Sequence, residues 1–325
     1  MTSYDIAIIG AGPAGLYGTY YAGFRGFSTV LIDALEEPGG QVTAMYPEKD
    51  IFDIAGFPRV RGRDLVDGLL SQAEQFNPTI ILNTNVEDLQ VNDELVELKL
   101  SNGQTLQVKA VVITGGIGAF TPRALPVGME WHGRGLVHFV PSLHDHQGKD
   151  VVIVGGGDSA FDWAYSLNGI ARSITLVHRR DTFRAHAAMV DTVKNLGVEL
   201  ITNSEVSAVT GSEHIESVEI MDKVSGASRV LPCQTLVAAL GFVANIGPIA
   251  NWGIDLEKRR ILVNTAMQTN LPRVFAAGDI TTYAGKVPLI AVGFGEAATA
   301  VNNAAPLIHE NMGIFPGHSS GGGAD

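Results

Sequence analysis

Residues 6–15 read IAIIGAGPAG, an apolar run followed by a glycine-rich turn with the spacing G-x-G-x-x-G. A turn of this kind, between a buried strand and a helix, is typical of sites that bind the pyrophosphate of a dinucleotide. Gly10 allows the tight turn, Gly12 lets the backbone approach the phosphates, and Gly15 lets the helix pack on the sheet. The helix N-terminus then offers unpaired N–H groups and the positive end of its dipole.

An acidic residue follows at the distance that such a site requires. The next apolar run, TVLI, ends in Asp33, 18 residues after Gly15, where a carboxylate accepts hydrogen bonds from ribose hydroxyl groups. Strand, turn, helix and acid together predict a first dinucleotide site. A plain strand–turn–helix bend is the alternative, and it does not need the acid.

The same pattern occurs again near the middle of the chain, with the opposite charge after it. Residues 151–160 read VVIVGGGDSA, with alanine in place of the third glycine, which the fingerprint accepts. The following apolar run ends in histidine and arginines, which hydrogen-bond a 2′-phosphate that a carboxylate would repel. The second site is therefore predicted to bind NADP(H). Its predicted contacts are Gly155, Gly157, Asp158, Ser159, Ala160, His178, Arg179, Arg180 and Arg184.

A third signature of nucleotide binding lies in residues 274–279, which read VFAAGD. A buried strand there delivers Asp279 beside a glycine, in a position to hydrogen-bond ribityl hydroxyl groups. An ordinary helix cap is the alternative.

The order of the elements predicts an α/β protein made of two Rossmann-like three-layer nucleotide-binding domains, the second inserted into the first. The first domain comprises residues 1–116 and 243–325, and the second comprises residues 117–242. The chain is expected to pass from the first domain to the second at residues 115–118 and to return at residues 241–245. These glycine-containing crossings are either a hinge or tight turns in rigid linkers.

Short strands are predicted between the first helices and the crossing. Residues 95–100 and 105–109 form a hairpin that turns at Asn102-Gly103, and residues 111–114 form a separate buried strand.

Composition narrows the class of protein. The net charge of −12 argues against a general nucleic-acid binder, and no apolar run approaches the ~18–20 residues of a membrane span. The first strand begins near Tyr4, which leaves no room for a signal peptide, so a cytoplasmic protein is expected.

Cys233 is the only cysteine, so neither an internal disulfide nor a dithiol redox pair can form. We expect a buried structural thiol.

The whole pattern resembles the thioredoxin-reductase-like pyridine-nucleotide flavoproteins. The resemblance covers residues 4–310 and rests on both glycine turns, on Gly39-Gly40-Gln41, and on residues 178–185 and 276–279. Thioredoxin reductases carry Cys-x-x-Cys just before the second turn, where this chain has LVHFVPS at residues 136–142. Without a dithiol, electrons cannot pass by thiol exchange.

The chain is most similar to the cysteine-free members, the ferredoxin/flavodoxin–NADP⁺ reductases, through residues 41–49, residues 55–58 and the C-terminal extension. The resemblance implies a homodimer in which NADPH passes a hydride to FAD, and FAD passes single electrons to ferredoxin or flavodoxin. No protein residue is expected to act as an acid or base.

The resemblance also implies residues that hold the flavin. Tyr46 stacks on one face of the isoalloxazine ring, and His318 of the extension covers the other face. Besides Gly10, Gly12 and Gly15 of the first turn, the implied FAD contacts are Asp33, Gln41, Val86, Phe120, Asp279 and Ser320.

Other interpretations stay open at this level. The chain could instead be a flavoenzyme that reduces oxygen, quinones or small disulfides, or a redox-sensing flavoprotein. Arg59, Arg61 and Arg63 are either a docking surface for an acidic carrier or a solvated loop. His144-Asp145-His146 lacks a complete set of metal ligands, and no metal is expected there.

Overall fold

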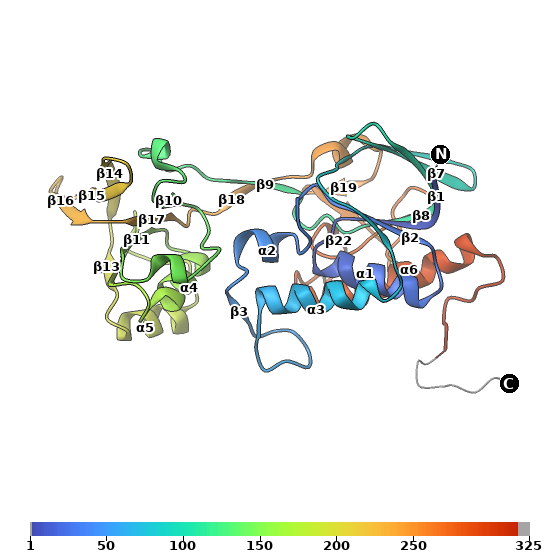
Figure 1. Ribbon diagram of the computed structural model, residues 1–325, viewed down its shortest axis with the longest axis horizontal. Coiled ribbons are helices and arrows are strands. Elements are labelled where there is room, and N and C mark those ends of the chain that lie inside the picture. The colour runs from blue at the N-terminus through green and yellow to red at the C-terminus, as the bar shows by residue number, and fades with distance from the viewer. Residues whose placement is uncertain (1, 318–325) are drawn as a thin grey trace. The chain divides into compact units, whose positions relative to one another are not determined.

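The computed structural model describes residues 2–317, and the chain forms two compact units (Figure 1). Unit 1 comprises Met1–Ala44, Asp50–Ala119 and Ala244–Asp325, and unit 2 comprises Met45–Lys49 and Phe120–Val243. Each unit is built on a sheet with parallel strands, which confirms the prediction of an α/β protein.

The main sheet of unit 1 has the order β5-β2-β1-β8-β7-β6, with β21 also paired to β8. Its strands are β1 (Thr2–Ile9), β2 (Thr29–Ile32), β5 (Thr79–Ile81), β6 (Val86–Asn92), β7 (Leu95–Leu100), β8 (Thr105–Ile113) and β21 (Val274–Ala276). Parallel pairing places Ile9 beside both Ile32 and Ile113, so these strands end at the same edge. After β1 the chain continues to β2 on one side of it, and later returns to β8 on the other side. This reversal of strand order next to β1 is the switch point at which such sheets bind ligands.

One prediction about this sheet was wrong. The two strands predicted at residues 105–109 and 111–114 are one strand, β8, which ends at Ile113, and β6 was not predicted at all. The first half of β8 pairs with β7 in antiparallel fashion and alternates in burial, whereas its second half is wholly buried and pairs with β21 in parallel fashion. Because β8 changes its neighbouring strand along its length, its hydrophobic pattern changes from alternating to continuous. In the sequence this change of pattern resembles a break between two strands.

In the described part of unit 1, four helices lie or begin, and α1 contacts both α3 and α6 (Figure 1). They are α1 (Pro13–Phe24), α2 (Gln41–Met45), α3 (Gly62–Glu74) and α6 (Ile290–Ile308). The small strands of the unit are β3 (Asp50–Ile51), β4 (Val60–Arg61), β19 (Leu256–Glu257), β20 (Arg260–Leu262) and β22 (Thr281–Thr282). Within residues 2–317, no helix has both the length and the apolar character that a membrane span requires.

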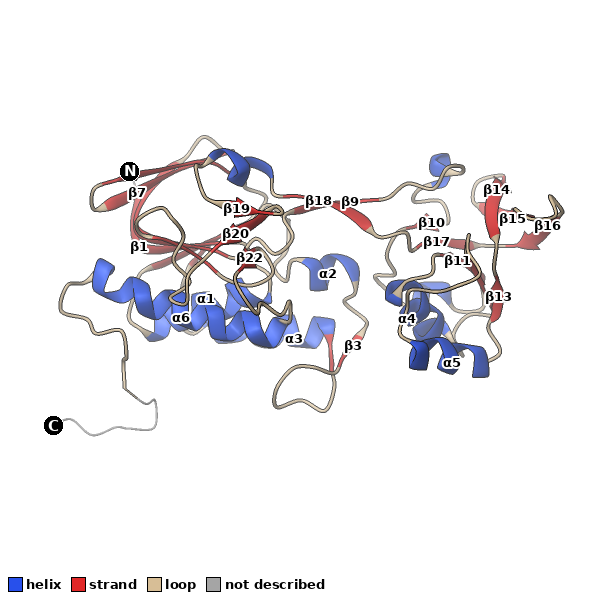
Figure 2. Ribbon diagram, turned by 180° about the vertical axis from the view of Figure 1, so that it is seen from behind, coloured by secondary structure: helices blue, strands red, loops and turns tan. Residues whose placement is uncertain are grey.

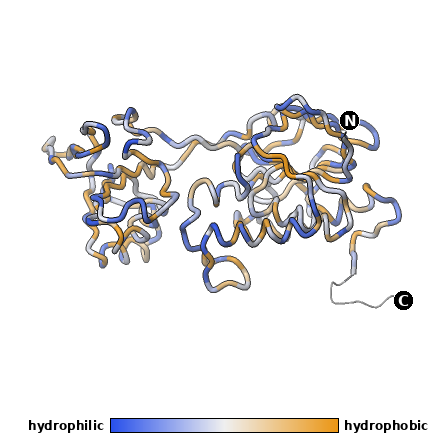
Figure 3. Tube along the Cα trace, in the orientation of Figure 1, coloured by the Kyte–Doolittle hydropathy of each residue, from blue (hydrophilic) through white to orange (hydrophobic). Residues whose placement is uncertain are grey.

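Unit 2 repeats the plan of unit 1. Its parallel sheet has the order β10-β17-β11-β12-β13. The elements are β10 (Leu136–Val137), β11 (Asp150–Val154), α4 (Asp158–Leu167), β12 (Ser173–Val177), α5 (Ala187–Asn195), β13 (Glu199–Ile201) and β17 (Thr235–Ala238), followed in a second sheet by β14 (Ser204–Gly211), β15 (Ile215–Asp222) and β16 (Ser228–Pro232). Buried apolar clusters fill both faces of the parallel sheet, and Figure 3 shows hydrophobic segments running through the interior of each unit.

Two strands, β9 (Ala119–Pro122) and β18 (Phe242–Asn245), carry the chain into and out of unit 2. They pair with each other as a two-stranded sheet, and Figure 2 shows them side by side. Gly118 has a φ of 76°, and a Cβ atom there would lie 2.3 Å from the Asn245 carbonyl oxygen. Only glycine therefore fits where the outgoing strand begins.

Candidate nucleotide-binding sites

The first glycine turn has the shape of a phosphate-binding loop. The Gly10 N–H donates to the Ile32 carbonyl at 2.8 Å, which fixes the turn to the end of β2. A Cβ atom on Gly15 would lie 1.8 Å from the Gly10 carbonyl oxygen, so the helix can approach the turn only at a glycine. A Cβ atom on Gly12 would meet no atom within 4 Å. The turn is thus closely packed behind Gly15 and open at Gly12, which fits a bound pyrophosphate.

Asp33 is held against this turn. Its carboxylate accepts hydrogen bonds from the Ala11 N–H and, at 2.7 Å, from the Leu35 N–H. Burial raises the pKa of Asp33 from its usual value, while these two hydrogen bonds oppose the rise. The sequence predicted a partner for ribose hydroxyl groups, and the structure adds a second role, in which Asp33 supports the turn itself.

The Gly39-Gly40-Gln41 stretch is brought to the same place. The Gly39 N–H donates to the Ala11 carbonyl at 2.8 Å, and a Cβ atom on Gly40 would lie 3.0 Å from the Gly12 Cα. A Cβ atom on Gly116 would lie 3.0 Å from the Gln41 Nε2. Segments that are far apart in the sequence therefore meet at the first turn.

The other predicted flavin contacts are distributed more widely. A Cβ atom on Gly278 would lie 3.3 Å from the Ala14 Cβ of α1. Asp279 follows Gly278 and is half-buried, with a pKa that burial raises. Val86 is buried at the start of β6. His318, Ser320 and the side chain of Phe120 lie outside the described part of the chain.

Tyr46 belongs to unit 2. Its half-buried ring packs against the apolar cluster around α4, and the Lys49 ammonium lies 6.0 Å from the ring centroid. Lys49 in turn forms an ion pair with Asp162 of α4. Stacking of Tyr46 on a flavin stays a prediction.

The second turn has the same construction as the first. The Gly155 N–H donates to the Val177 carbonyl at 3.0 Å, and a Cβ atom on Gly155 would lie 2.5 Å from the Ala239 carbonyl oxygen. Gly157, like Gly12, has open space where a Cβ atom would be. The N-terminus of α4 begins directly after it, at Asp158.

The predicted NADP-binding residues are gathered on this turn. The Arg184 N–H donates to the Gly156 carbonyl at 2.7 Å, and the His186 N–H donates to the Asp158 carboxylate at 2.9 Å. The His178 ring lies so close to Gly156 that a Cβ atom there would be 2.3 Å from it. Burial lowers the pKa of His178, which favours the neutral form of the ring. The side chains of Arg179, Arg180 and Arg184 are all exposed beside the turn.

Three further groups of residues have local explanations. Arg59 lies 3.5 Å from Asp50 and Arg61 lies 2.8 Å from Asp64, with all four side chains exposed.

Cys233 is fully buried, and burial raises the pKa of its thiol to about 12. His146 is buried, with its Nδ1 3.1 Å from the Thr235 hydroxyl. Among the described residues, no three His, Cys, Asp or Glu side chains are grouped to hold a metal.

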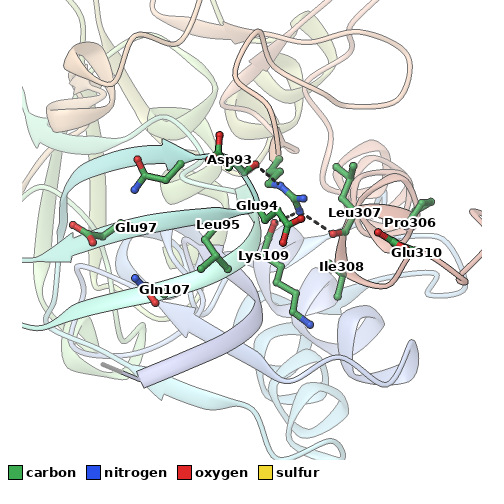
Figure 4. Close-up of a pocket in the computed structure, with 12 residues that line it drawn as sticks. Asp93, Glu94, Leu95, Glu97, Gln107, Lys109, Pro306, Leu307, Ile308 and Glu310 are labelled. Carbon is green, nitrogen blue, oxygen red and sulfur yellow. Dashed lines mark hydrogen bonds between the residues drawn. The ribbon is translucent and has the colours of Figure 1, made fainter.

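A cavity of about 840 Å³ lies at the opposite end of the unit 1 sheet from the glycine turn, beside Gln107 and Lys109 of β8 (Figure 4). The Arg273 guanidinium donates to the carbonyl oxygens of Asp93, Lys109 and Leu307 at 3.2, 3.1 and 2.8 Å. Arg273 therefore connects the β6–β7 turn, β8 and the end of α6, a structural role that leaves the nucleotide sites as the functional candidates.

Two Rossmann-like units, each with a glycine turn at its switch point, have the architecture of a protein that holds two nucleotides. The chain belongs to the pyridine nucleotide-disulphide oxidoreductase family, whose model matches residues 4–304.

Among its relatives, a ferredoxin–NADP reductase of Nocardioides sp. is 58% identical over 322 residues, which is 98% of this chain and 97% of that protein. One of Frankia casuarinae is 58% identical over 316 residues, which is 97% of this chain and 98% of that protein. The crystal structure of T. acidophilum thioredoxin reductase is similar with a TM-score of 0.79 and 23% identity, covering 94% of this chain and 98% of that one. The predicted thioredoxin-reductase-like fold and the resemblance to ferredoxin–NADP reductases are confirmed.

Proposed function

We propose that the chain is an FAD-dependent ferredoxin–NADP reductase. The observation that carries this proposal is the identity of 58%, over nearly the full length of both chains, to relatives named for that activity. The two sites support it, because the acid at the first turn suits a dinucleotide with a free ribose and the exposed arginines at the second suit NADPH. When bound, FAD would supply the chemistry of accepting a hydride from NADPH and releasing electrons one at a time.

The protein's own residues bind and orient these groups. The first turn, Asp33, Gln41, Val86 and Asp279 hold FAD, together with Tyr46, Phe120, His318 and Ser320. The second turn and the arginines beside it hold NADPH. A homodimer in the cytoplasm, with ferredoxin or flavodoxin as the acceptor, is part of the same proposal and is supported by the resemblance in sequence.

Reduction of disulfides is the less favoured activity. A thiolate is the attacking species in thiol exchange, and Cys233 is both buried and held as a thiol by its raised pKa. Since it is the chain's only cysteine, no dithiol is present to relay electrons.

The direct test is NADPH-dependent reduction of a purified bacterial ferredoxin, followed through cytochrome c. We expect turnover that depends strongly on ferredoxin and is unchanged in Cys233→Ala. A flavin that NADPH bleaches, but that gives no ferredoxin-dependent turnover, would retain both nucleotide sites and refute the acceptor. Fast oxygen consumption would indicate an oxidase, and no turnover with any acceptor would indicate a redox sensor.

Replacing Arg59, Arg61 and Arg63 with glutamate should raise the apparent KM for ferredoxin about tenfold at low salt. The physical reason is that steered association with an acidic partner depends on local positive charge and is screened by salt. NADPH-to-dye activity, which needs no docking, is the control and should be preserved. Equal losses in both assays would count against a docking surface.

A further inference from the structure

Glu296 is a charged residue in an otherwise apolar part of α6, and its side chain is only 5% exposed. Its carboxylate accepts hydrogen bonds from three groups. The Gly278 N–H donates at 2.7 Å, the Tyr283 hydroxyl at 2.5 Å, and the Lys286 ammonium at 2.5 and 2.6 Å. Lys286 is buried as well, with 4% of its side chain exposed.

All three donors come from residues 278–286, the segment between β21 and α6 that contains Asp279. One carboxylate therefore holds both ends of this segment. The Gly278 backbone has a φ of 82°, and the Thr281 hydroxyl donates to its carbonyl at 2.8 Å. A Cβ atom on Gly293 of α6 would lie 3.4 Å from the Gly278 Cα. The helix α6 and the turn at Gly278 are therefore in close contact directly before Asp279.

Stability alone does not account for the Lys286–Glu296 pair. Removing two charges from water is costly, and apolar residues of similar volume often serve the fold as well or better. Burial, followed by the bond to Glu296, raises the pKa of Tyr283 to about 12, so its phenol stays neutral and donates a hydrogen bond. The cluster therefore holds one negative and one positive charge, both buried.

Both charges act on Asp279. Burial is the main influence on the pKa of Asp279 and raises it, Lys286 and Arg260 lower it, and Glu296 raises it. The carboxylate implied to contact the flavin thus lies within the field of each member of the pair, and their effects oppose each other.

We propose that Glu296 and Lys286 are positioning residues for the flavin. Glu296 fixes the turn that presents Asp279, and the opposite charges of the pair balance, so that the redox equilibrium of bound FAD depends on both. This inference rests on the proposed function, because it requires FAD in unit 1. Neither residue was predicted from the sequence, where a single glutamate within the apolar residues 290–301 was the available signal.

The test compares Glu296→Gln with Lys286→Met. Glu296→Gln leaves an unbalanced cation that favours the reduced, more negatively charged flavin, so the ratio of reduced to oxidised FAD affinity should rise about tenfold. Lys286→Met leaves an unbalanced anion, and the same ratio should fall about tenfold. Each change equals a shift of about 30 mV in a two-electron potential, measured by anaerobic equilibration with a reference dye.

Two variants without a net change in charge are the controls. The double variant Glu296→Gln/Lys286→Met should keep the affinity ratio within twofold of wild type, yet bind oxidised FAD about fivefold more weakly, because a neutral acceptor holds Gly278 less strongly. Tyr283→Phe should also leave the ratio unchanged. FAD affinity is measured by the change in flavin fluorescence on binding to apoprotein, and folding by circular dichroism.

The proposal is overturned if both single variants shift the potential in the same direction, or if the double variant binds FAD as tightly as wild type. The affinity of the double variant decides the matter if a single variant does not fold. Failure of ferredoxin reduction with FAD still bound would refute the acceptor and leave this inference standing, whereas a wild-type protein that binds no FAD would refute both.

Discussion

Gly15→Ala is expected to give a protein that is purified without flavin and is less stable than the wild type. The added Cβ atom would lie 1.8 Å from the Gly10 carbonyl oxygen and 2.7 Å from the Thr114 hydroxyl. The first of these is backbone, which cannot move away as the end of a flexible side chain can. The free energy of unfolding should fall by at least about 3 kcal/mol, at or beyond the usual cost of overpacking. Flavin absorbance per protein and denaturant unfolding measure the two effects.

Gly12→Ala is the matched variant, because its Cβ atom meets nothing within 4 Å. The backbone of Gly12 is extended, with a φ of −68°, so alanine causes no strain there. We expect a stable protein that binds FAD at least about tenfold more weakly, since the methyl group occupies the space that the phosphates approach. Equal flavin content in Gly12→Ala and the wild type would show that the turn holds no pyrophosphate.

Arg179→Gln/Arg180→Gln is expected to remove most of the preference for NADPH over NADH. We expect that preference to be roughly a hundredfold in the wild type, or about 2.8 kcal/mol. Exposed guanidinium groups supply it through charge-assisted bonds to the 2′-phosphate, which NADH lacks. The measurement is kcat/KM with each coenzyme.

Arg172→Gln is the control for this pair. Arg172 is an exposed arginine just before β12, at the opposite end of that strand from Arg179, and it forms an ion pair with Asp150. Its loss should leave the coenzyme ratio unchanged. A wild type that uses NADH as efficiently as NADPH would contradict the assignment of the second site.

The parts that could be predicted from the sequence are those in which neighbouring residues determine the chemistry. Each glycine turn, the strand before it and the helix after it form one continuous stretch, residues 2–24 in unit 1 and 150–167 in unit 2, so their order alone indicates the fold. The charge after the next strand, Asp33 in one unit and Arg179 in the other, was found because the spacing of such sites is regular.

The parts that could not be predicted depend on contacts between distant segments. Nothing local shows that β8 changes partner along its length, or that the His178 ring covers Gly156. The hydrogen bond from Gly278 to Glu296 likewise exists only because β21 places the turn against α6. Such contacts follow from topology, which the local pattern of residues does not contain.

The pairing of β9 with β18 makes the middle of this chain separable. Because the two strands are hydrogen-bonded neighbours, the polypeptide enters and leaves residues 120–243 at nearly the same point. A stretch with adjacent ends can be exchanged for its counterpart in a relative without straining the chain on either side. A chimera made at these two strands, with Met45–Lys49 exchanged as well because they belong to the same unit, would therefore transfer the choice of coenzyme, while the host kept its own flavin turn.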